Sequence, residues 1–413
     1  MARLVLKFGG TSLADMERLR HAAAHVGREV EAGHEVTVVV SAMAGVTNQL
    51  INWTREAATI HDAREYDAVV STGEQVTSGL LVMILQNNSI AARSWLGWQV
   101  PIITSGVHGA ARIENIDITH LNERLAQKQV PVVAGFQGVG PDNRITTLGR
   151  GGSDTSAVAL AVALGADRCD IYTDVEGVYT ADPRMVVSAR KIDRVTYEEM
   201  LEMASLGAKV LQTRSVELAM AHDIKLCVRS SFASPEEGDS PFSGTLVCGE
   251  DKIMEQEIVS GITYAHDEAK ITLVQVADKP GVAADIFDPL ADVGINVDMI
   301  VQNVSENGEQ TDVTFTVSRN DLPEALKIME NCRDALGYRK IISAEDVAKV
   351  SVVGVGMRSH AGSALRMFRA LADKGINIQV ISTSEIKISV LIEEQYTELA
   401  VRALHTAYGL DGA

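Results

Sequence analysis

Aromatic side chains are scarce in this chain, since Phe, Tyr and Trp together make up only 4% of its 413 residues. Its hydrophobic cores must therefore be built from Val, Ile, Leu, Ala and Met. Cysteine is scarce too, and the four cysteines lie far apart and form no CxxC pair. A zinc site or a disulfide framework is therefore disfavoured, and a reducing cytoplasm is the expected location.

Basic residues are outnumbered, with 37 Lys and Arg against 55 Asp and Glu and a formal net charge of −18. This balance argues against nucleic acid or an anionic membrane as a partner, because both reward basic patches. A small anionic substrate is still allowed, since a few local Lys and Arg side chains can dominate one site. Long apolar runs are also missing: the start has no signal-peptide core, and the run 157–166 is too short to span a bilayer.

What the chain does have is an ordinary globular composition, 46% hydrophobic and 22% charged, and enough length for two or three domains. Strand-like and helix-like stretches alternate up to about residue 230. Strands are expected at 4–6, 36–40, 131–134, 170–173 and 225–228, with a last one at 244–247. The alternation predicts an α/β fold with a largely parallel sheet, in which ligands bind beyond the C-terminal ends of the strands.

The first candidate site follows the first strand, where Lys7-Phe8-Gly9-Gly10-Thr11-Ser12 leads into a helix expected over 14–31. A lysine, two glycines and a helix N-terminus together favour an anion, because free N–H groups and the positive end of the helix dipole meet there. The Walker A pattern GxxxxGK[ST] is absent. Taken alone, the segment is equally well explained as an ordinary glycine turn.

Two further glycine-rich loops carry charged side chains. In 146–156, Arg150 is surrounded by glycines and could bind a carboxylate through both arms of its guanidinium, while Ser153 or Asp154 could be a plain helix N-cap. In 172–184, two tyrosines could wall a nucleotide pocket and Arg184 could bind phosphate. A structural hairpin loop explains that second segment equally well.

Two more residues lie near expected helix starts. Glu74 is in the first turn of a helix after Ser71-Thr72-Gly73, where a carboxylate is favourable with or without a function. Lys209 is mildly unfavourable at its helix start, which a phosphate partner would explain. His108, His222 and His360 are isolated, show no metal-ligand spacing and are interpreted as structural or surface residues.

The C-terminal part contains an internal repeat. The segment 290–300 matches 371–381, and the same offset aligns Gly281 with Gly362 and Phe287 with Phe368. Each copy is predicted to form a βαββαβ, ferredoxin-like module. The boundary with the preceding α/β domain is placed near 249–257, after an acidic stretch containing proline and glycine.

Taken together, these segments resemble aspartokinase, and the resemblance covers essentially the whole chain. The segments that carry it are 7–12, 41–47, 71–74, 149–154, 173–184 and the repeated Gly-Ile-Asn stretch. The resemblance implies an amino-acid-kinase (carbamate-kinase-like) three-layer domain over 1–250 and two ACT modules over 257–343 and 344–413. It also implies that MgATP phosphorylates the β-carboxylate of L-aspartate to 4-phospho-L-aspartate, the entry step to lysine, threonine, methionine and diaminopimelate. The length resembles the monofunctional type that is regulated by lysine and threonine, without a fused homoserine dehydrogenase.

The resemblance also implies which residues act. The expected catalytic residues are Lys7 and Asp154. The expected ATP-binding set is Lys7, Phe8, Gly9, Gly10, Thr173, Asp174, Tyr179, Arg184 and Lys209. The expected aspartate-binding set is Ser41, Thr47, Glu74, Arg150, Gly151, Gly152, Ser153 and Asp154. No side chain is expected to bind metal directly, because the ATP phosphates would hold Mg²⁺. Aspartate brings its own carboxylate nucleophile, so positioning and electrostatics must supply most of the rate.

The ACT repeat implies feedback inhibition by lysine and threonine. The expected effector set is Asp278, Gly281, Val282, Ala283, Asn296, Asp298, Gln302, Asn377, Ile378, Thr383 and Glu385. A homo-oligomer formed through the ACT modules is expected, and a separately made regulatory subunit starting near Met254 is an open alternative. Two rival functions are a kinase acting on glutamate or a nucleotide, and an amino-acid sensor with an inactive kinase domain.

Overall fold

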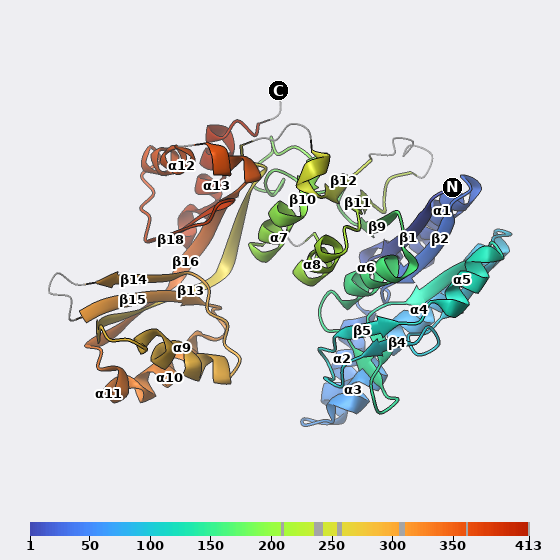
Figure 1. Ribbon diagram of the computed structural model, residues 1–413, viewed down its shortest axis with the longest axis horizontal. Helices are drawn as coiled ribbons and strands as arrows, with labels where there is room; N and C mark the ends of the chain where they lie inside the picture. Colours follow the sequence, from blue (N-terminus) through green and yellow to red (C-terminus); the bar gives the residue numbers. More distant parts are fainter. Residues whose placement is uncertain (208–209, 235–242, 254–257, 305–309, 361, 412–413) are drawn as a thin grey trace. The chain divides into compact units, whose positions relative to one another are not determined.

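The computed structural model describes residues 1–207, 210–234, 243–253, 258–304, 310–360 and 362–411. The chain divides into two compact units (Figure 1). Unit 1 contains Met1–Val178, Lys191–Ala204 and Lys209–Glu255, and unit 2 contains Tyr179–Arg190, Ser205–Ala208 and Gln256–Ala413. The segment Tyr179–Arg190 therefore groups with unit 2, although it lies inside the stretch 1–250 that was predicted as one domain.

Unit 1 is built on an eight-stranded sheet in the order β10-β12-β11-β9-β1-β2-β6-β3. The strands are β1 (Arg3–Phe8), β2 (Glu35–Val40), β3 (Ala92–Trp95), β6 (Val130–Ala134), β9 (Arg168–Thr173), β10 (Arg194–Thr196), β11 (Leu226–Ser230) and β12 (Thr245–Cys248). The six strands from β11 to β3 run parallel, and only the β11–β12 pair is antiparallel. The largely parallel α/β fold expected from the alternating pattern is confirmed.

The helices of unit 1 are α1 (Met16–Glu31), α2 (Val46–Ala57), α3 (Ala63–Val70), α4 (Thr72–Asn87), α5 (Thr119–Ala126), α6 (Gly152–Leu164), α7 (Tyr197–Ser205) and α8 (Thr213–Ala221). Side chains alternate between the two faces of a strand. In β1, Leu6 and Phe8 join the core formed with α1 and α4, while Lys7 reaches α6. The helices α1 and α4 thus cover one face of the sheet and α6 the other, where α8 packs against it.

The stretch Ala63–Asn87 passes the length and composition test for a membrane-crossing helix. Half of its apolar window is buried within the structure, and the stretch is divided into α3 and α4 at Ser71. Burial of this kind is what a core helix shows. A second, four-stranded sheet adjoins these helices, in the order β5-β4-β7-β8. Its strands are β4 (Ile102–Thr104), β5 (Ile113–Ile116), β7 (Gln137–Val139) and β8 (Ile145–Thr147).

Unit 2 contains a six-stranded antiparallel sheet in the order β14-β15-β13-β16-β18-β17. Its strands are β13 (Gly261–Ala277), β14 (Ile300–Val304), β15 (Gln310–Val317), β16 (Lys340–Val353), β17 (Val380–Thr383) and β18 (Lys387–Glu393). Its helices are α9 (Val282–Asp292), α10 (Leu322–Asn331), α11 (Arg333–Leu336), α12 (Ser363–Ala372) and α13 (Thr397–Ala407). Two separate hydrophobic cores lie under α9 and α10 and under α12 and α13.

The two halves of unit 2 repeat the same backbone design. Gly281 and Gly362 are the left-handed N-caps of α9 and α12, with φ of 95° and 98°. Gly294 and Gly375, in the two Gly-Ile-Asn turns, are also left-handed, with φ of 80° and 69°. Only glycine adopts this conformation at little cost, so the spacing that revealed the repeat is fixed by the backbone.

The long strands β13 and β16 are shared by both modules. Residues 270–274 of β13 pair with 340–344 of β16 in the first module, while 261–265 pair with 349–353 in the second. The second module is therefore completed by a strand that precedes the first module in sequence. The boundary predicted between residues 343 and 344 falls inside β16, so neither module is a single closed stretch of chain.

Candidate active site at the carboxyl ends of the strands

A lysine and an aspartate meet beyond the end of β1. Lys7 Nζ lies 2.5 Å from Asp154 Oδ1, and each residue is only 8% exposed. Asp154 is in the first turn of α6, where the helix dipole favours a carboxylate. The fold thus pairs the charges of two segments that are far apart in sequence and places them at the edge of the sheet where α/β proteins bind ligands.

The glycine turn after Lys7 packs tightly on its neighbours. The Gly9 N–H donates to the Tyr172 carbonyl oxygen at 3.1 Å, and Ser12 Oγ donates to the same oxygen at 3.3 Å. A Cβ on Gly9 would lie 3.5 Å from Lys7 Nζ, and one on Gly10 would lie 3.1 Å from the Ala42 carbonyl oxygen. A side chain at Gly9 would therefore contact the lysine ammonium, and one at Gly10 would press on the Ala42 carbonyl oxygen.

The helix expected over 14–31 begins slightly later in the structure. A short 3-10 helix, η1 (Thr11–Leu13), comes first, and α1 begins only at Met16. Asp15 caps α1 by accepting the Arg18 N–H at 2.9 Å, so this end of the helix dipole already has a carboxylate. That the α1 dipole stabilises a bound anion therefore stays a prediction. In the part of the chain that the structure describes, the N–H groups of Gly10 and Thr11 donate to no protein atom.

Glu74 is a buried carboxylate in the first turn of α4. Its Oε1 accepts the Ala42 N–H at 3.0 Å, while Oε2 is buried without a hydrogen-bond partner. Burial raises the pKa of Glu74 to about 7, against the opposing effect of the Ala42 hydrogen bond. A buried oxygen without a partner is costly, so it marks a place where a ligand N–H group would fit.

The loop 41–47 lies against the start of α4. The Ser41 N–H donates to the Phe8 carbonyl oxygen at 3.1 Å, which ties this loop to the end of β1. Thr47 is the second residue of α2, whose N-cap is the left-handed Gly45. At Gly73 a Cβ would come within 2.7 Å of the Ala42 Cβ, so the glycine allows α4 and the loop to approach each other.

Arg150 extends from the loop between β8 and α6. It is exposed and forms no ion pair or hydrogen bond with the residues that the structure describes. Gly149 and Gly151 on either side are left-handed, with φ of 77° and 70°. The N-cap of α6 is Gly151, and Ser153 lies inside the helix, so the N-cap interpretation of Ser153 is wrong. Gly152 packs under Phe136 and Leu148, where a Cβ would come within 2.8 Å and 2.9 Å.

The third predicted segment is divided between the two units. Thr173 ends β9 in unit 1, where its carbonyl oxygen accepts the Ser231 N–H at 2.8 Å and its hydroxyl donates to Asp174 at 3.2 Å. Tyr179 and Arg184 belong to unit 2. Lys209 lies outside the described residues, and so does Met254.

Arg184 is engaged within its own unit. It is 86% exposed and forms a two-armed ion pair with Asp182, which also accepts the Tyr264 hydroxyl at 2.9 Å. The Arg184 hydrogen bond is the main reason that the pKa of Asp182 falls to about 2. A phosphate would therefore have to compete with Asp182 for this arginine.

The buried carboxylate of Asp67, which lies in no recognisable motif, supports the Arg150 loop. Asp67 in α3 accepts hydrogen bonds from His108 Nδ1 at 2.7 Å and from Thr147 Oγ1 at 2.5 Å. It also accepts the N–H groups of Gly109 and Thr147 at 3.1 Å. These bonds fix the end of β8, and they give His108 the structural role expected of it.

The predicted effector residues gather on the loops and edges of unit 2. Asp278, Ala283, Asn296, Gln302, Asn377, Thr383 and Glu385 are exposed, and Val282 is buried. Asp298 pairs with the buried Lys349 of β16, which also lies 2.5 Å from Glu268. At the equivalent repeat position, Gln379 accepts from Lys270 at 2.5 Å. Glu385 pairs with Arg358 at 3.5 Å.

Family models match almost the whole chain. The amino acid kinase family matches residues 2–230, and the ACT domain matches residues 270–334 and 350–408. Within the described residues, no group of three or more His, Cys, Asp and Glu side chains is arranged to hold a metal ion.

Several known proteins that match the chain over its full length are named as aspartokinases. An aspartokinase of Pseudomonas aeruginosa is 55% identical over 413 residues, covering 100% of this chain and 98% of the relative. An aspartokinase of Mycolicibacterium smegmatis is 45% identical over 417 residues, covering 100% and 97%. The structure of E. coli aspartokinase III in complex with aspartate and ADP matches with a TM-score of 0.80 and 28% identity, covering 98% of this chain and 99% of that one. The same enzyme in complex with lysine and aspartate matches with a TM-score of 0.74 at 28% identity, covering 98% of each chain.

Proposed function

This chain belongs to the aspartokinase family and is an aspartate kinase with ACT regulatory domains, and we propose that it transfers the γ-phosphoryl group of MgATP to the β-carboxylate of L-aspartate. The products are 4-phospho-L-aspartate and ADP. The observation that carries this proposal is the buried Lys7–Asp154 pair beside a glycine turn with free N–H groups. It supplies fixed charge where a transferring phosphoryl group needs it.

Lys7 and the glycine turn fit the phosphate end of a nucleotide. The N–H groups of Gly10 and Thr11 have no acceptor in the described protein, and the Gly9 Cα leaves open the space in front of the Lys7 ammonium. Thr173 is the last residue of β9 and Asp174 comes directly after it, and β9 is adjacent to β1 in the sheet. Tyr179, Arg184 and Lys209 complete the proposed nucleotide-binding set. Bound magnesium would neutralise phosphate charge, and the phosphates rather than side chains would hold it.

Arg150 and Glu74 fit the two charged main-chain groups of the substrate aspartate, its α-carboxylate and its ammonium group. The exposed Arg150 guanidinium has no protein partner among the described residues and can take the substrate α-carboxylate through two hydrogen bonds. The orphaned Glu74 Oε2 can accept from the ammonium group. Ser41, Thr47, Gly151, Gly152 and Ser153 would line the remaining surface. Asp154 would keep the Lys7 ammonium directed at the phosphoryl group.

The ACT modules support control by amino acids, and lysine and threonine are the proposed effectors. E. coli aspartokinase III has been solved with lysine bound. In this chain the loops before α9 and α12 begin helices with glycine N-caps that make no side-chain capping bond. Their first N–H groups suit an amino-acid carboxylate. We place the enzyme in the cytoplasm as a homo-oligomer, at the entry to lysine, threonine, methionine and diaminopimelate synthesis.

One coupled assay tests the activity and its rivals. ADP release is measured with aspartate or glutamate as the acceptor, with and without lysine plus threonine. Turnover with aspartate that lysine and threonine suppress is the expected result. Turnover with glutamate alone would favour a different amino-acid kinase, and no turnover with either acceptor would favour a sensor with an inactive kinase domain. Unchanged activity at saturating lysine and threonine would contradict the proposed effectors.

A further inference from the structure

The side chain of Arg150 has no partner among the described residues, so its place is set by its backbone alone. Gly149 and Gly151 on either side are left-handed, with φ of 77° and 70°. Glycine has the greatest backbone freedom and offers no side chain with which the loop could pack. The position of the Arg150 guanidinium therefore depends on the groups that hold the backbone before and after it.

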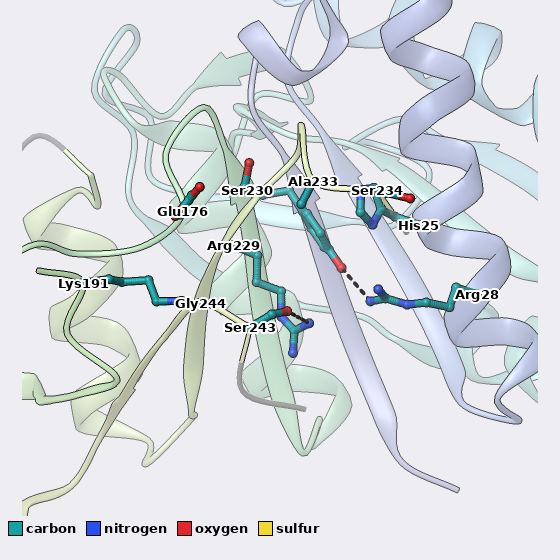
Figure 2. Close-up of a pocket in the computed structure, with 11 residues that line it drawn as sticks. His25, Arg28, Glu176, Lys191, Arg229, Ser230, Ala233, Ser234, Ser243 and Gly244 are labelled. Atoms are coloured by element: carbon teal, nitrogen blue, oxygen red, sulfur yellow. Dashed lines mark hydrogen bonds between the residues drawn. The ribbon is translucent and has the colours of Figure 1, made fainter. Parts of the chain in front are cut away.

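The cavity between α1 and β11 does not supply these groups. It has a volume of about 130 Å³, and none of the residues proposed to bind aspartate or ATP lines it (Figure 2). Tyr172 in its lining stacks on Phe8 in the core beneath α1, so the cavity belongs to the α1 face of the large sheet. Arg150 lies instead in the loop that leads into α6, on the other face, where α8 packs.

Arg214 of α8 holds the backbone just before Arg150. Its Nη1 donates to the Leu148 carbonyl oxygen at 3.1 Å, and its Nη2 donates to the Ala111 carbonyl oxygen at 3.0 Å. The Ala111 N–H in turn donates to the Thr147 carbonyl oxygen at 2.9 Å. One guanidinium thus ties together two segments of chain, and arginine suits this task because its planar fork presents several donors in fixed directions.

The charge of Arg214 is not used in an ion pair with the residues that the structure describes. Partial burial, followed by the charge of the neighbouring Arg112, lowers the pKa of Arg214. A buried guanidinium beside a second positive charge is costly, so its two bonds to carbonyl groups must offset that cost. Arg214 therefore acts as a double donor to the backbone and not as the counter-ion of a carboxylate.

Gln212, the N-cap residue of α8, packs on the other side of Arg150. A Cβ on Gly151 would come within 1.9 Å of Gln212 Cγ, so only glycine fits at this position beside the glutamine. Gly151 is itself the N-cap of α6. The start of α8 thus contacts the loop both before and after Arg150.

Asp67 of α3 anchors the same loop independently of α8. Its carboxylate accepts the N–H groups of Gly109 and Thr147, both at 3.1 Å. A Cβ on Gly149 would lie 3.1 Å from the Gly109 carbonyl oxygen, so the two chain segments are also closely stacked. With this anchor intact, the loss of Arg214 should loosen the loop rather than unfold it.

We infer that Arg214 is a positioning residue for aspartate binding. It fixes the Leu148 carbonyl group and thereby directs the Arg150 guanidinium at the α-carboxylate of the substrate, while Gln212 restrains the loop at Gly151. The inference rests on the proposed role of Arg150. Without Arg214 the loop adopts more conformations, and only a fraction of them presents Arg150 correctly, so the apparent affinity for aspartate falls by that fraction.

Steady-state kinetics of Arg214→Gln, with aspartate and MgATP varied separately, test the inference. The KM for aspartate is expected to rise about tenfold, as it would if about a tenth of the loop conformations presented Arg150 correctly. The kcat and the KM for MgATP should stay within about twofold, because binding of one substrate is lost and not the chemistry. Arg214→Lys should recover only part of the loss, since an ammonium group lacks the two-armed geometry.

Arg112→Gln is the matched control. Arg112 is an exposed arginine close enough to influence Arg214, and its side chain bonds to none of the described residues. This variant removes the same charge without removing a bond to the loop, so both KM values should be unchanged. If Arg214→Gln does not fold, Gln212→Ala replaces it, with a smaller rise in the KM for aspartate alone.

A double variant separates positioning from a general structural role. If Arg214 acts through Arg150, the combination of Arg150→Gln with Arg214→Gln should raise the KM for aspartate no further than Arg150→Gln does alone. Additive effects, or equal rises in the two KM values of Arg214→Gln, would reduce Arg214 to a framework residue and overturn the inference.

The single variants also distinguish this inference from the proposed function. A raised KM for aspartate in Arg150→Gln beside an unchanged one in Arg214→Gln would overturn the inference and leave the function standing. An unchanged KM in Arg150→Gln would remove Arg150 from the aspartate site, and the inference would fail with that assignment.

Discussion

Lys7 Nζ and Asp154 Oδ1 form a 2.5 Å ion pair that is nearly closed to solvent, at the point where β1 ends and α6 begins. Each side chain is the counter-ion of the other, so the removal of either one would leave an unpaired charge buried in the protein. A phosphoryl group that arrives at the glycine turn would share Lys7 with Asp154. The pair is therefore both a structural link between two segments and the proposed source of phosphate stabilisation.

Replacing Lys7 is expected to abolish most turnover while the chain still folds. Lys7→Ala should lower kcat by about 10²–10³, which is typical when one preorganised donor to a transition state is lost. It should also lower the free energy of unfolding by roughly 3–5 kcal/mol, because Asp154 keeps a buried charge without its partner. Steady-state kinetics and urea unfolding measure the two effects, and near-normal turnover would contradict the assignment.

A double variant separates the two effects of this pair. Lys7→Met combined with Asp154→Asn removes both buried charges, so most of the lost unfolding free energy should return. Activity should stay absent, because the ammonium is still missing. If the double variant regained turnover together with stability, Lys7 would act only through folding.

Glu74 is expected to make substrate binding and stability depend on pH in opposite directions. Its pKa is raised from 4.5 to about 7 by burial, so the folded chain holds this proton more tightly than the unfolded chain does. The stability contribution of Glu74 is therefore greatest below pH 4.5 and is lost as pH rises toward 7, by roughly 3 kcal/mol in total. Aspartate binding should strengthen over the upper part of that range, because the ammonium group needs the ionised carboxylate.

The variant Glu74→Gln tests both parts of this prediction. It keeps an acceptor for the Ala42 N–H but cannot ionise, so the part of the pH dependence of stability that Glu74 contributes should disappear. The KM for aspartate should rise by tenfold or more at pH 8, with a smaller change in kcat. Glu65→Gln, at an exposed carboxylate of α3, is the control and should leave the KM unchanged. An unchanged KM in Glu74→Gln would remove Glu74 from the aspartate site.

Local patterns in the sequence predicted six of the eight strands of the large sheet in unit 1, the glycine turns and the repeat, because each is determined within a few residues. Gly281 and Gly362, for example, both mark left-handed helix caps. The short strands β3 and β10 and the four strands of the second sheet were not predicted. Contacts between distant residues could not be predicted in this way. The segment 179–190 belongs to unit 2 through bonds such as Thr180 Oγ1 to His405 Nε2, at 2.8 Å, whose partners lie 225 residues apart.

The close packing at the start of α6 predicts that Gly152→Ala is destabilising. Its Cβ would meet Phe136 at 2.8 Å and Leu148 at 2.9 Å, so the helix or the β6 loop must shift. We expect a loss of about 1–3 kcal/mol in the free energy of unfolding and a weaker Arg150 site. Gly79→Ala in α4 is the matched control, because no atom lies within 4 Å of its Cβ position. That change should stabilise the chain by up to about 1 kcal/mol, and equal effects at the two sites would contradict the packing argument.

The buried Lys349 predicts how Asp298 takes part in regulation. Lys349 is 5% exposed and pairs with Glu268, which is also buried, and with the half-exposed side chain of Asp298. Lys349→Met should cost roughly 3–5 kcal/mol of unfolding free energy, because Glu268 would keep a buried charge. Asp298→Asn should cost less than about 1 kcal/mol, since its side chain reaches water and Lys349 retains Glu268. Urea unfolding measures both changes. If Asp298 is an effector contact, Asp298→Asn should also raise the lysine and threonine concentrations needed for inhibition, whereas an unchanged inhibition curve would assign Asp298 to the framework of β16 alone.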